Sequence, residues 1–202
     1  VKIKLYGAKI LLVEDNMINQ ELAMELLTNN GLIVEVACNG QEALDKLATT
    51  TFDGVLMDCQ MPVLDGYTAT RLLREQNNFK NLPIIALTAN TMKGDKEKVL
   101  AAGMNDHIAK PINVYNMLAT MAKWITPSHP VKPPQVNIPA EQDSAAATKL
   151  PSVLHKLSGI DINAGLETTL NNTALYLKLL RMFRNNQHDF EVQFRNAQSN
   201  GK

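Results

Sequence analysis

Apolar and polar residues alternate in blocks along the chain from residue 9 to about residue 125. Short apolar runs, typical of buried strands, alternate with longer stretches whose apolar residues recur every three or four positions, as on one face of a helix. The predicted strands are 10–13, 33–36, 52–58, 84–88 and 107–109, and the predicted helices are 16–30, 40–48, 67–76, 93–102 and 114–125.

Strands separated by helices of this length require right-handed crossover connections, which produce a parallel sheet with helices on both faces. Five such units suit the flavodoxin-like strand order 2-1-3-4-5. The fold class predicted for this part of the chain is therefore α/β, a doubly wound five-stranded parallel sheet.

The composition changes after Trp124, because six of the nine prolines lie between residues 127 and 151. Proline breaks helices and strands, so this stretch is predicted to be a semi-extended linker. Helical patterning returns beyond it, with an apolar stripe from about 173 to 197. We expect a domain at 8–125, a Pro-rich linker at 126–158 and a short all-α segment at 159–202. The predicted stripe consists of Leu175, Leu179, Met182, Phe183, Phe190 and Phe194.

Charge and cysteine content narrow the function classes. The 20 basic and 20 acidic side chains cancel, so the broad basic field of a non-specific nucleic-acid binder is absent. Cys38 and Cys59, the two cysteines, are expected to be reduced and to pack as small apolar residues. Without a signal peptide or a membrane-length apolar run, a cytoplasmic module without membrane contact is expected. Because the chain starts at Val1, we expect a fragment, whose parent protein could be anchored in the inner membrane.

Acidic, hydroxyl and lysine side chains stand at the ends of four predicted strands. Glu14 and Asp15 follow the first strand, Asp58 ends the third, Thr88 ends the fourth and Lys110 follows the fifth. The carboxyl ends of parallel strands meet at one edge, where open α/β folds carry their chemistry. Three carboxylates together repel unless a cation lies among them. A lysine and a hydroxyl beside them suit a phosphoryl group, so the pattern predicts a phosphoacceptor site.

Each of these groups has a candidate role. Asp58 is the candidate nucleophile, since an aspartate accepts a phosphoryl group when the incoming charge is neutralised. Glu14 and Asp15 would hold Mg²⁺ together with Asp58, because hard oxygen ligands suit that ion. Lys110 would pair with one phosphate oxygen, and Thr88 would donate a hydrogen bond to another.

The same residues carry a family resemblance over roughly residues 8 to 125. The chain resembles the receiver domain of two-component response regulators, and most of all the receivers of hybrid sensor histidine kinases. The motifs that carry it are Leu-Val-Glu14-Asp15-Asn16, Leu-Met-Asp58-Cys-Gln-Met-Pro62, Ala-Leu-Thr88-Ala89 and Lys110-Pro111.

The resemblance implies that Asp58 takes a phosphoryl group from the phosphohistidine domain of a histidine kinase, in a Mg²⁺-dependent reaction. It also implies that the backbone carbonyl of Gln60 is a further metal ligand, that Thr88 shifts toward the phosphoryl group, and that the Lys110–Pro111 bond is cis. The parent protein would be a hybrid histidine kinase in a phosphorelay. This chain would then catalyse only the phosphorylation and dephosphorylation of its own aspartate.

His107 departs from the family pattern. An aromatic side chain that moves inward on phosphorylation is usual three positions before the lysine. A histidine can fill that space as the switch residue and respond to pH, or it can lie half exposed at the surface. Both interpretations stay open.

The tail resembles the opening of a histidine phosphotransfer domain, in the segments 159–166 and 174–180. Such a domain would receive the phosphoryl group from Asp58 on a histidine, which we expect beyond residue 202. His129, His155 and His188 lack the sequence setting of a phosphotransfer histidine. The second module is therefore expected to be incomplete, and a second copy of the chain is a further candidate partner.

Three other function classes fit the sequence less well. A phosphohydrolase of the haloacid-dehalogenase type has a second aspartate two residues after the nucleophile, but Gln60 stands there and cannot donate a proton. A receiver-like docking module without turnover would be expected to have lost Asp58 or Lys110. A dinucleotide-binding role lacks the glycine-rich motif after the first strand.

Overall fold

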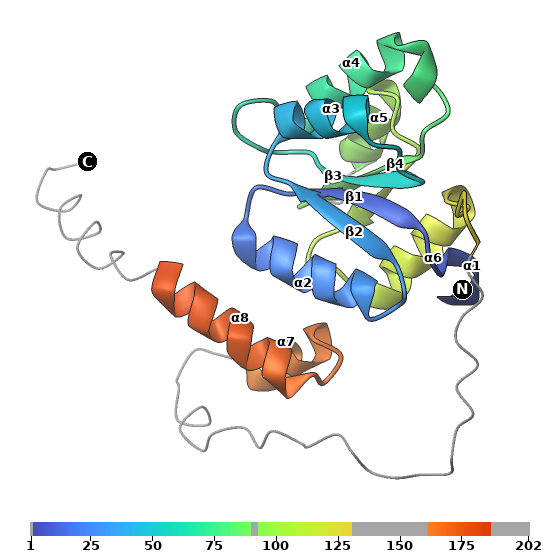
Figure 1. Ribbon diagram of the computed structural model, residues 1–202. Coiled ribbons are helices and arrows are strands. Elements are labelled where there is room, and N and C mark those ends of the chain that lie inside the picture. The colour runs from blue at the N-terminus through green and yellow to red at the C-terminus, as the bar shows by residue number, and fades with distance from the viewer. Residues whose placement is uncertain (1, 90–92, 131–160, 187–202) are drawn as a thin grey trace, which may run out of the picture. The chain divides into compact units, whose positions relative to one another are not determined.

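The computed structural model describes residues 2–89, 93–130 and 161–186. The chain divides into two compact units between Gln142 and Asp143. The first unit contains a five-stranded parallel sheet of order β2-β1-β3-β4-β5, which confirms the predicted fold class (Figure 1). Its strands are β1 Lys9–Val13, β2 Ile33–Ala37, β3 Gly54–Asp58, β4 Ile84–Thr88 and β5 Asp106–Ala109.

Helices cover both faces of this sheet, as Figure 1 shows. On one face lie α1, α2 and α6, and on the other α3, α4 and α5. The helices are α1 Lys2–Leu5, α2 Met17–Thr28, α3 Gly40–Thr49, α4 Gly66–Glu75, α5 Lys93–Ala101 and α6 Val114–Trp124, and a 3₁₀ turn, η1, spans Asn77–Phe79.

The core is divided between these two faces by the alternation of side chains along each strand. Ile10 and Leu12 of β1 pack against the α2 and α6 side, whereas Leu11 and Val13 pack against the other. All five residues of β3 are buried. A strand buried on both faces reads as a continuous apolar run, which is why its position was visible in the sequence.

Side-chain caps start the helices shortly after the strands end. Asn16 accepts hydrogen bonds from the backbone N–H groups of Ile18 and Asn19 at 2.9 and 3.2 Å and so begins α2 three residues after β1. Asp65 caps α4 in the same way, accepting from Thr68 N at 2.9 Å. Such caps satisfy the free N–H groups of a first helical turn.

The packed unit includes an N-terminal element that the sequence did not predict. Leu5 of α1 is fully buried in the core beneath α2 and α6, and the Lys4 ammonium donates a hydrogen bond to the Ala122 carbonyl. Tyr6 lies directly over Gly31, which has φ +82 and where a Cβ atom would come within 2.3 Å of the Tyr6 ring. Glycine is required there both for its backbone conformation and for this close approach.

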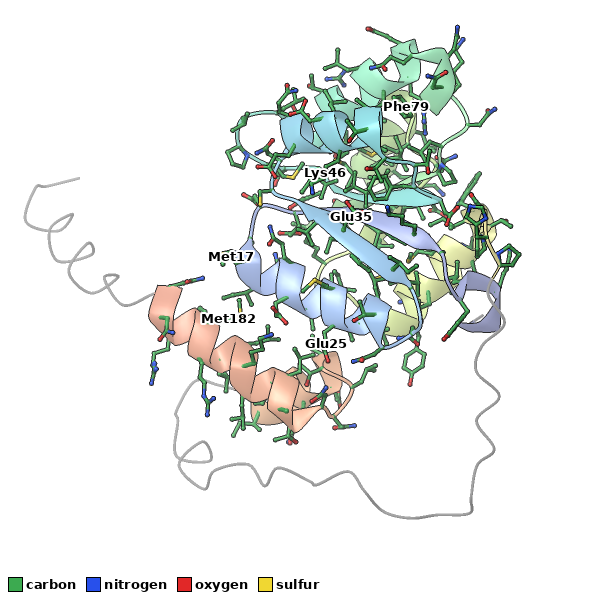
Figure 2. All side chains as sticks on the ribbon, viewed as in Figure 1. Met17, Glu25, Glu35, Lys46, Phe79 and Met182 are labelled. Carbon is green, nitrogen blue, oxygen red and sulfur yellow. The ribbon has the colours of Figure 1, made fainter. Side chains whose placement is uncertain are left out.

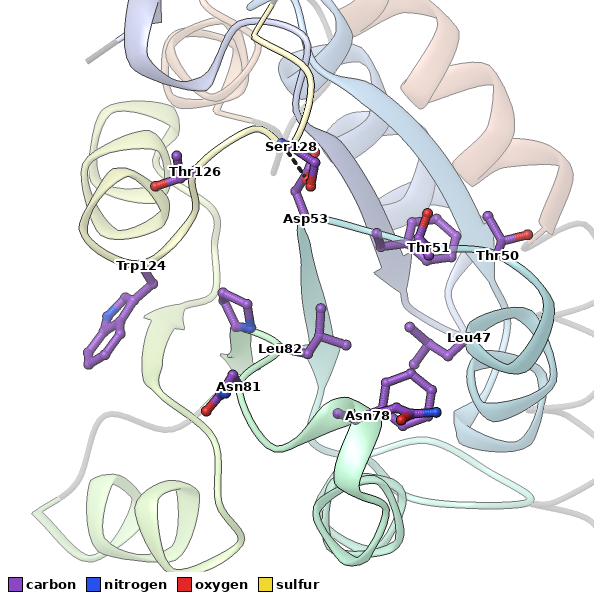
Figure 3. Close-up of a pocket in the computed structure, with 13 residues that line it drawn as sticks. Leu47, Thr50, Thr51, Asp53, Asn78, Asn81, Leu82, Trp124, Thr126 and Ser128 are labelled. Atoms are coloured by element: carbon purple, nitrogen blue, oxygen red, sulfur yellow. Dashed lines mark hydrogen bonds between the residues drawn. The ribbon is translucent and has the colours of Figure 1, made fainter.

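The opposite, amino-terminal edge of the sheet is organised by Asp53, which immediately precedes β3. One carboxylate oxygen accepts from Lys9 N at 2.8 Å, and the other accepts from Ser128 N at 2.8 Å and from the Ser128 hydroxyl. A cavity of about 350 Å³ opens beside this contact, with Trp124, Thr50 and Asn78 among its lining residues (Figure 3). It lies at the end of the sheet opposite the predicted site.

The second unit contains two described helices, α7 Ile162–Thr168 and α8 Thr173–Asn186. Asp161 caps α7 by accepting from Ala164 N at 3.0 Å, and Tyr176 of α8 packs against Gly165. Leu175 of the predicted apolar stripe is buried, but Phe183 is 55% exposed, so the stripe is not buried along its whole length.

Several predicted features, namely most of the linker, Phe190, Phe194, His155 and His188, lie outside the described residues. None of the helices within 2–89, 93–130 and 161–186 is long and apolar enough to cross a membrane.

Candidate functional site

The predicted site residues lie at the carboxyl ends of four neighbouring strands. Glu14 and Asp15 directly follow β1, Asp58 ends β3, Thr88 ends β4 and Lys110 directly follows β5. Because the strands are parallel, these ends share one edge. One carboxylate oxygen from each of Glu14, Asp15 and Asp58 lies within 4.8 Å of the others. The structure thus brings the three predicted carboxylates together.

Lys110 connects two of these carboxylates. Its ammonium lies 2.6 Å from Glu14 Oε2 and 2.6 Å from Asp58 Oδ2. Partial burial by itself lowers the pKa of Lys110, but the hydrogen bonds and charges of Asp58 and Glu14 outweigh it and raise the pKa above its ordinary value. Lys110 therefore stays protonated between the two acids. The Lys110–Pro111 peptide bond is cis, as the resemblance implies.

Glu14 is almost completely buried, and polar residues of α2 hold it in place. Asn19 Nδ2 donates to Glu14 Oε1 at 2.9 Å, and Gln20 Nε2 donates to the Glu14 carbonyl at 2.6 Å. Neither of these supporting residues was predicted from the sequence. The available signal was their position one turn into a helix that begins directly behind the acidic pair, where side chains point back toward the strand end.

Asp58 is also nearly buried, and its surroundings leave a small space above it. Gln60 N donates to Asp58 Oδ1 at 3.2 Å. Gly66 begins α4 so close to β3 that a Cβ atom would lie 2.0 Å from the Asp58 carbonyl oxygen, so only glycine fits. A cavity of about 160 Å³ lies over Asp58, with Thr88 and Tyr67 in its wall. Thr88 is buried at this position.

The donor set fits a hard divalent cation. Three carboxylates gather while one lysine ammonium pairs with two of them, and this leaves negative charge that a cation would balance. Asp15 is exposed and, with Gln60 and Pro62, lines an open cavity next to the cluster. A metal held there would have room to keep water ligands, as Mg²⁺ usually does.

His107 lies in β5, and its side chain is 30% exposed. Among the described residues its buried Nδ1 has no hydrogen-bond partner, although Asp106 Oδ1 is 3.7 Å away. Partial burial by itself raises the pKa of Asp106, but the His107 backbone N–H, the Trp124 indole and the Lys123 charge outweigh it and lower the pKa below its ordinary value. The ring is thus partly exposed, and a switch role for His107 stays a prediction.

This arrangement can be compared with known proteins. A family profile described as the response regulator receiver domain matches residues 10–122. The chain belongs to the response regulator receiver family. Receivers act in two-component phosphorelay signalling, and the curated relatives of this chain include hybrid histidine kinases. Hybrid signal transduction histidine kinase I of Dictyostelium discoideum is 46% identical over 128 residues, which are 58% of this chain and 7% of that protein.

Two crystal structures of receivers are similar to this one. The receiver domain of the sensor histidine kinase PA1611 from Pseudomonas aeruginosa, which has a magnesium ion coordinated in its active-site cleft, is 45% identical with a TM-score of 0.55; the match covers 58% of this chain and 97% of that one. The Ssk1 receiver from Saccharomyces cerevisiae, solved with the histidine phosphotransfer protein Ypd1, is 31% identical with a TM-score of 0.56; the match covers 59% and 90%.

Proposed function

We propose that this receiver accepts a phosphoryl group on Asp58 in a Mg²⁺-dependent phosphorelay step. The observation that carries the proposal is the Asp58 carboxylate 2.6 Å from the Lys110 ammonium, within a cluster of three carboxylates. An attacking oxygen, a charge for the phosphoryl group and ligands for a metal are thereby close together. The assignment of the site roles to Glu14, Asp15, Asp58, Gln60, Thr88 and Lys110 is part of this proposal.

In the proposed reaction an Asp58 oxygen attacks the phosphorus of a phosphohistidine. The new O–P bond forms as the P–N bond breaks, and the imidazole, protonated on its other ring nitrogen, leaves neutral with the electron pair. Lys110 moves its ammonium from the carboxylate oxygens toward a phosphoryl oxygen, a short displacement because it already contacts Asp58. The Thr88 hydroxyl donates to a second phosphoryl oxygen from the wall of the same cavity.

Asp15, Glu14 and Asp58, with the Gln60 carbonyl, would hold the magnesium ion. The bound ion neutralises phosphoryl oxygens during transfer. Glu14 is buried and already bonded to Asn19 and Lys110, so it orients the cluster more than it opens to the ion. Asp15, which is exposed, is the ligand best able to adapt to it.

The phosphodonor and phosphoacceptor partners are proposed to dock beside this edge. Met17, the first residue of α2, is 62% exposed and points outward in Figure 2, and Val63, in the loop after β3, is 82% exposed. Exposed apolar side chains flanking a reactive group suit a protein partner. A histidine phosphotransfer domain is the partner class proposed, as in the Ypd1–Ssk1 complex.

The whole protein's role is a wider proposal. We infer that the chain is part of a hybrid histidine kinase and that residues from 159 onward open a histidine phosphotransfer domain. The helical pair of α7 and α8, which leaves Phe183 exposed for further packing, supports the second inference. Under this proposal the receiver occupies 8–125 and the linker 126–158.

The test of the proposed function is labelling with acetyl phosphate and Mg²⁺, followed by intact-mass measurement. A single base-labile phosphoryl adduct is expected, and peptide mapping should locate it at Asp58. Asp58→Asn should abolish the adduct while circular dichroism and thermal unfolding show an intact fold. An adduct that persists in this variant, or that maps to a histidine, would disprove the assignment.

A further inference from the structure

A second lysine, Lys98 on α5, lines the phosphoacceptor cavity. The 160 Å³ cavity over Asp58 is lined by Lys98 together with Thr88 and Tyr67. This volume equals about five water molecules at roughly 30 Å³ each, so a phosphoryl group fits inside. Lys98 therefore lines the space that a phosphoryl group on Asp58 would enter.

The charge balance of the site indicates that a further cation would stabilise its phosphorylated form. The charge of the three carboxylates would be balanced by the Lys110 ammonium together with a bound divalent cation. An aspartyl phosphate carries one more negative charge than the aspartate it replaces, so phosphorylation leaves the site with an excess negative charge. A cation in the cavity wall would stabilise the phosphorylated form more than the free form.

A structural role toward Asp65 is the alternative for Lys98, since both residues line a neighbouring cavity with Arg71. Asp65, however, already accepts from Thr68 N at 2.9 Å and from the Thr68 hydroxyl at 2.8 Å. Burial by itself raises the pKa of Asp65, but these bonds and the Arg71 charge outweigh it and lower the pKa. Thr68 and Arg71 thus account for the lowered pKa of Asp65, and Lys98 is not among the groups that lower it.

We propose that Lys98 is a second cationic ligand of the phosphoryl group on Asp58. It approaches from α5 while Lys110 approaches from β5, so the phosphoryl group is held between two lysines on different elements. Because Lys98 lines both cavities, it can turn from the Asp65 side toward the phosphoryl group by rotation of its long side chain. This inference rests on the proposed phosphorylation of Asp58, and it links α5 to the phosphorylation state.

The test compares Lys98→Gln, Lys98→Arg and Lys96→Gln with the unmodified chain. Lys96 is an exposed lysine on the same helix and is not among the residues that line the cavity, so it is the matched control. The probes are beryllofluoride with Mg²⁺, as a mimic of the bound phosphoryl group, and acetyl phosphate. Affinity for beryllofluoride, the decay rate of the aspartyl phosphate and the amide chemical shifts of α5 are measured.

Lys98→Gln should weaken beryllofluoride binding about three- to tenfold, in the range expected for a partly exposed charge contact. It should also reduce the changes in amide chemical shift that beryllofluoride causes in α5. Lys98→Arg should recover much of the affinity and of these shift changes. Lys96→Gln should behave like the unmodified chain. Equal affinity in Lys98→Gln and Lys96→Gln, with normal labelling, would overturn the role of Lys98 alone. Absence of labelling in the unmodified chain would overturn the proposed function instead.

Discussion

Strand β3 has an aspartate at each end, and the two carboxylates have opposite surroundings. Asp53, just before the strand, accepts from two backbone N–H groups and a serine hydroxyl. Asp58, at the other end, contacts the Lys110 ammonium and lies beside two more carboxylates. Neutral donors fully engage the first carboxylate, whereas the second depends on cations. The difference shows that two aspartates next to the same strand can take a structural and a chemical role because their partners differ.

The largest expected difference between the two ends of β3 is the effect of substitutions on Mg²⁺ affinity. Asp15→Asn is expected to weaken Mg²⁺ binding about tenfold or more, and Glu14→Gln by a smaller factor, because the buried Glu14 is already bonded to protein groups. Asp53→Asn should leave Mg²⁺ affinity unchanged. Isothermal titration, with the exposed Asp45→Asn as control, measures these affinities. Equal affinities in Asp15→Asn and the unmodified chain would mean that the metal binds elsewhere.

Removing Asp53, at the amino-terminal end of β3, should instead affect the stability of the fold and not the phosphorylation of Asp58. Asp53→Ala removes the acceptor for Lys9 N and for both Ser128 donors, so it should lower the free energy of unfolding by about 2 kcal/mol. Phosphorylation of Asp58 by acetyl phosphate should keep its normal extent in the folded protein. Urea denaturation and intact-mass labelling of the same samples test both statements. A labelling defect in a fully folded Asp53→Ala protein would contradict the separation of the two ends.

The pH dependence of stability should show the contribution of Lys110. Since its pKa is raised in the folded state, this stabilisation is complete below the unfolded lysine value near 10.4 and is lost as pH rises through the folded value. In Mg²⁺-free buffer, Lys110→Met should therefore be less stable near neutral pH and should lose less stability above about pH 10. Denaturation curves from pH 7 to the alkaline limit, set beside Lys123→Met, provide the measurement. Parallel curves for both variants would refute the assigned ion pair.

The smallest expected effect is the loss of stability on removing the Ser128 hydroxyl, which lies just after α6. Ser128→Ala removes one hydroxyl donor to Asp53 but keeps the backbone N–H bond, so a loss of about 0.5–1.5 kcal/mol is expected. In the Asp53→Ala background the same change should cost almost nothing, because the acceptor is already gone. A double-mutant cycle by urea denaturation measures this coupling. Additive losses would show that the Ser128 hydroxyl acts through another group.

The sequence predicted the strand order and the three-carboxylate cluster because both follow from local patterns. Apolar runs such as Ile84–Thr88 mark fully buried strands, and parallel pairing brings the polar residues at their ends to one edge. Other features depend on contacts between distant residues. Leu5 is buried only because α6 and the turn after α2 form its pocket, and four isolated residues carry no helical periodicity.

The same reasoning explains which site residues were missed. Asn19 and Gln20 support Glu14 through side-chain geometry across a loop, and their polar character is equally typical of a solvent-facing helix position. Lys98 reaches the cavity through the packing of α5, which composition does not determine. Phe183 shows the opposite limit, because helical spacing places it in an apolar stripe but does not determine whether a partner covers it, and it is exposed.

The Asp53 contact also determines how the receiver can be built into a longer polypeptide. The Asp53 carboxylate bonds both to Lys9, where the chain enters the sheet, and to Ser128, where the chain leaves the domain. The chain therefore enters and leaves at the same edge of the sheet. Five residues of β3, roughly 17 Å of strand, separate that edge from Asp58. The receiver can therefore be inserted into a longer chain with both flanking segments attached at the amino-terminal edge of its sheet. The carboxyl edge of the sheet, which carries Asp58, is then left accessible to the proposed phosphohistidine partner.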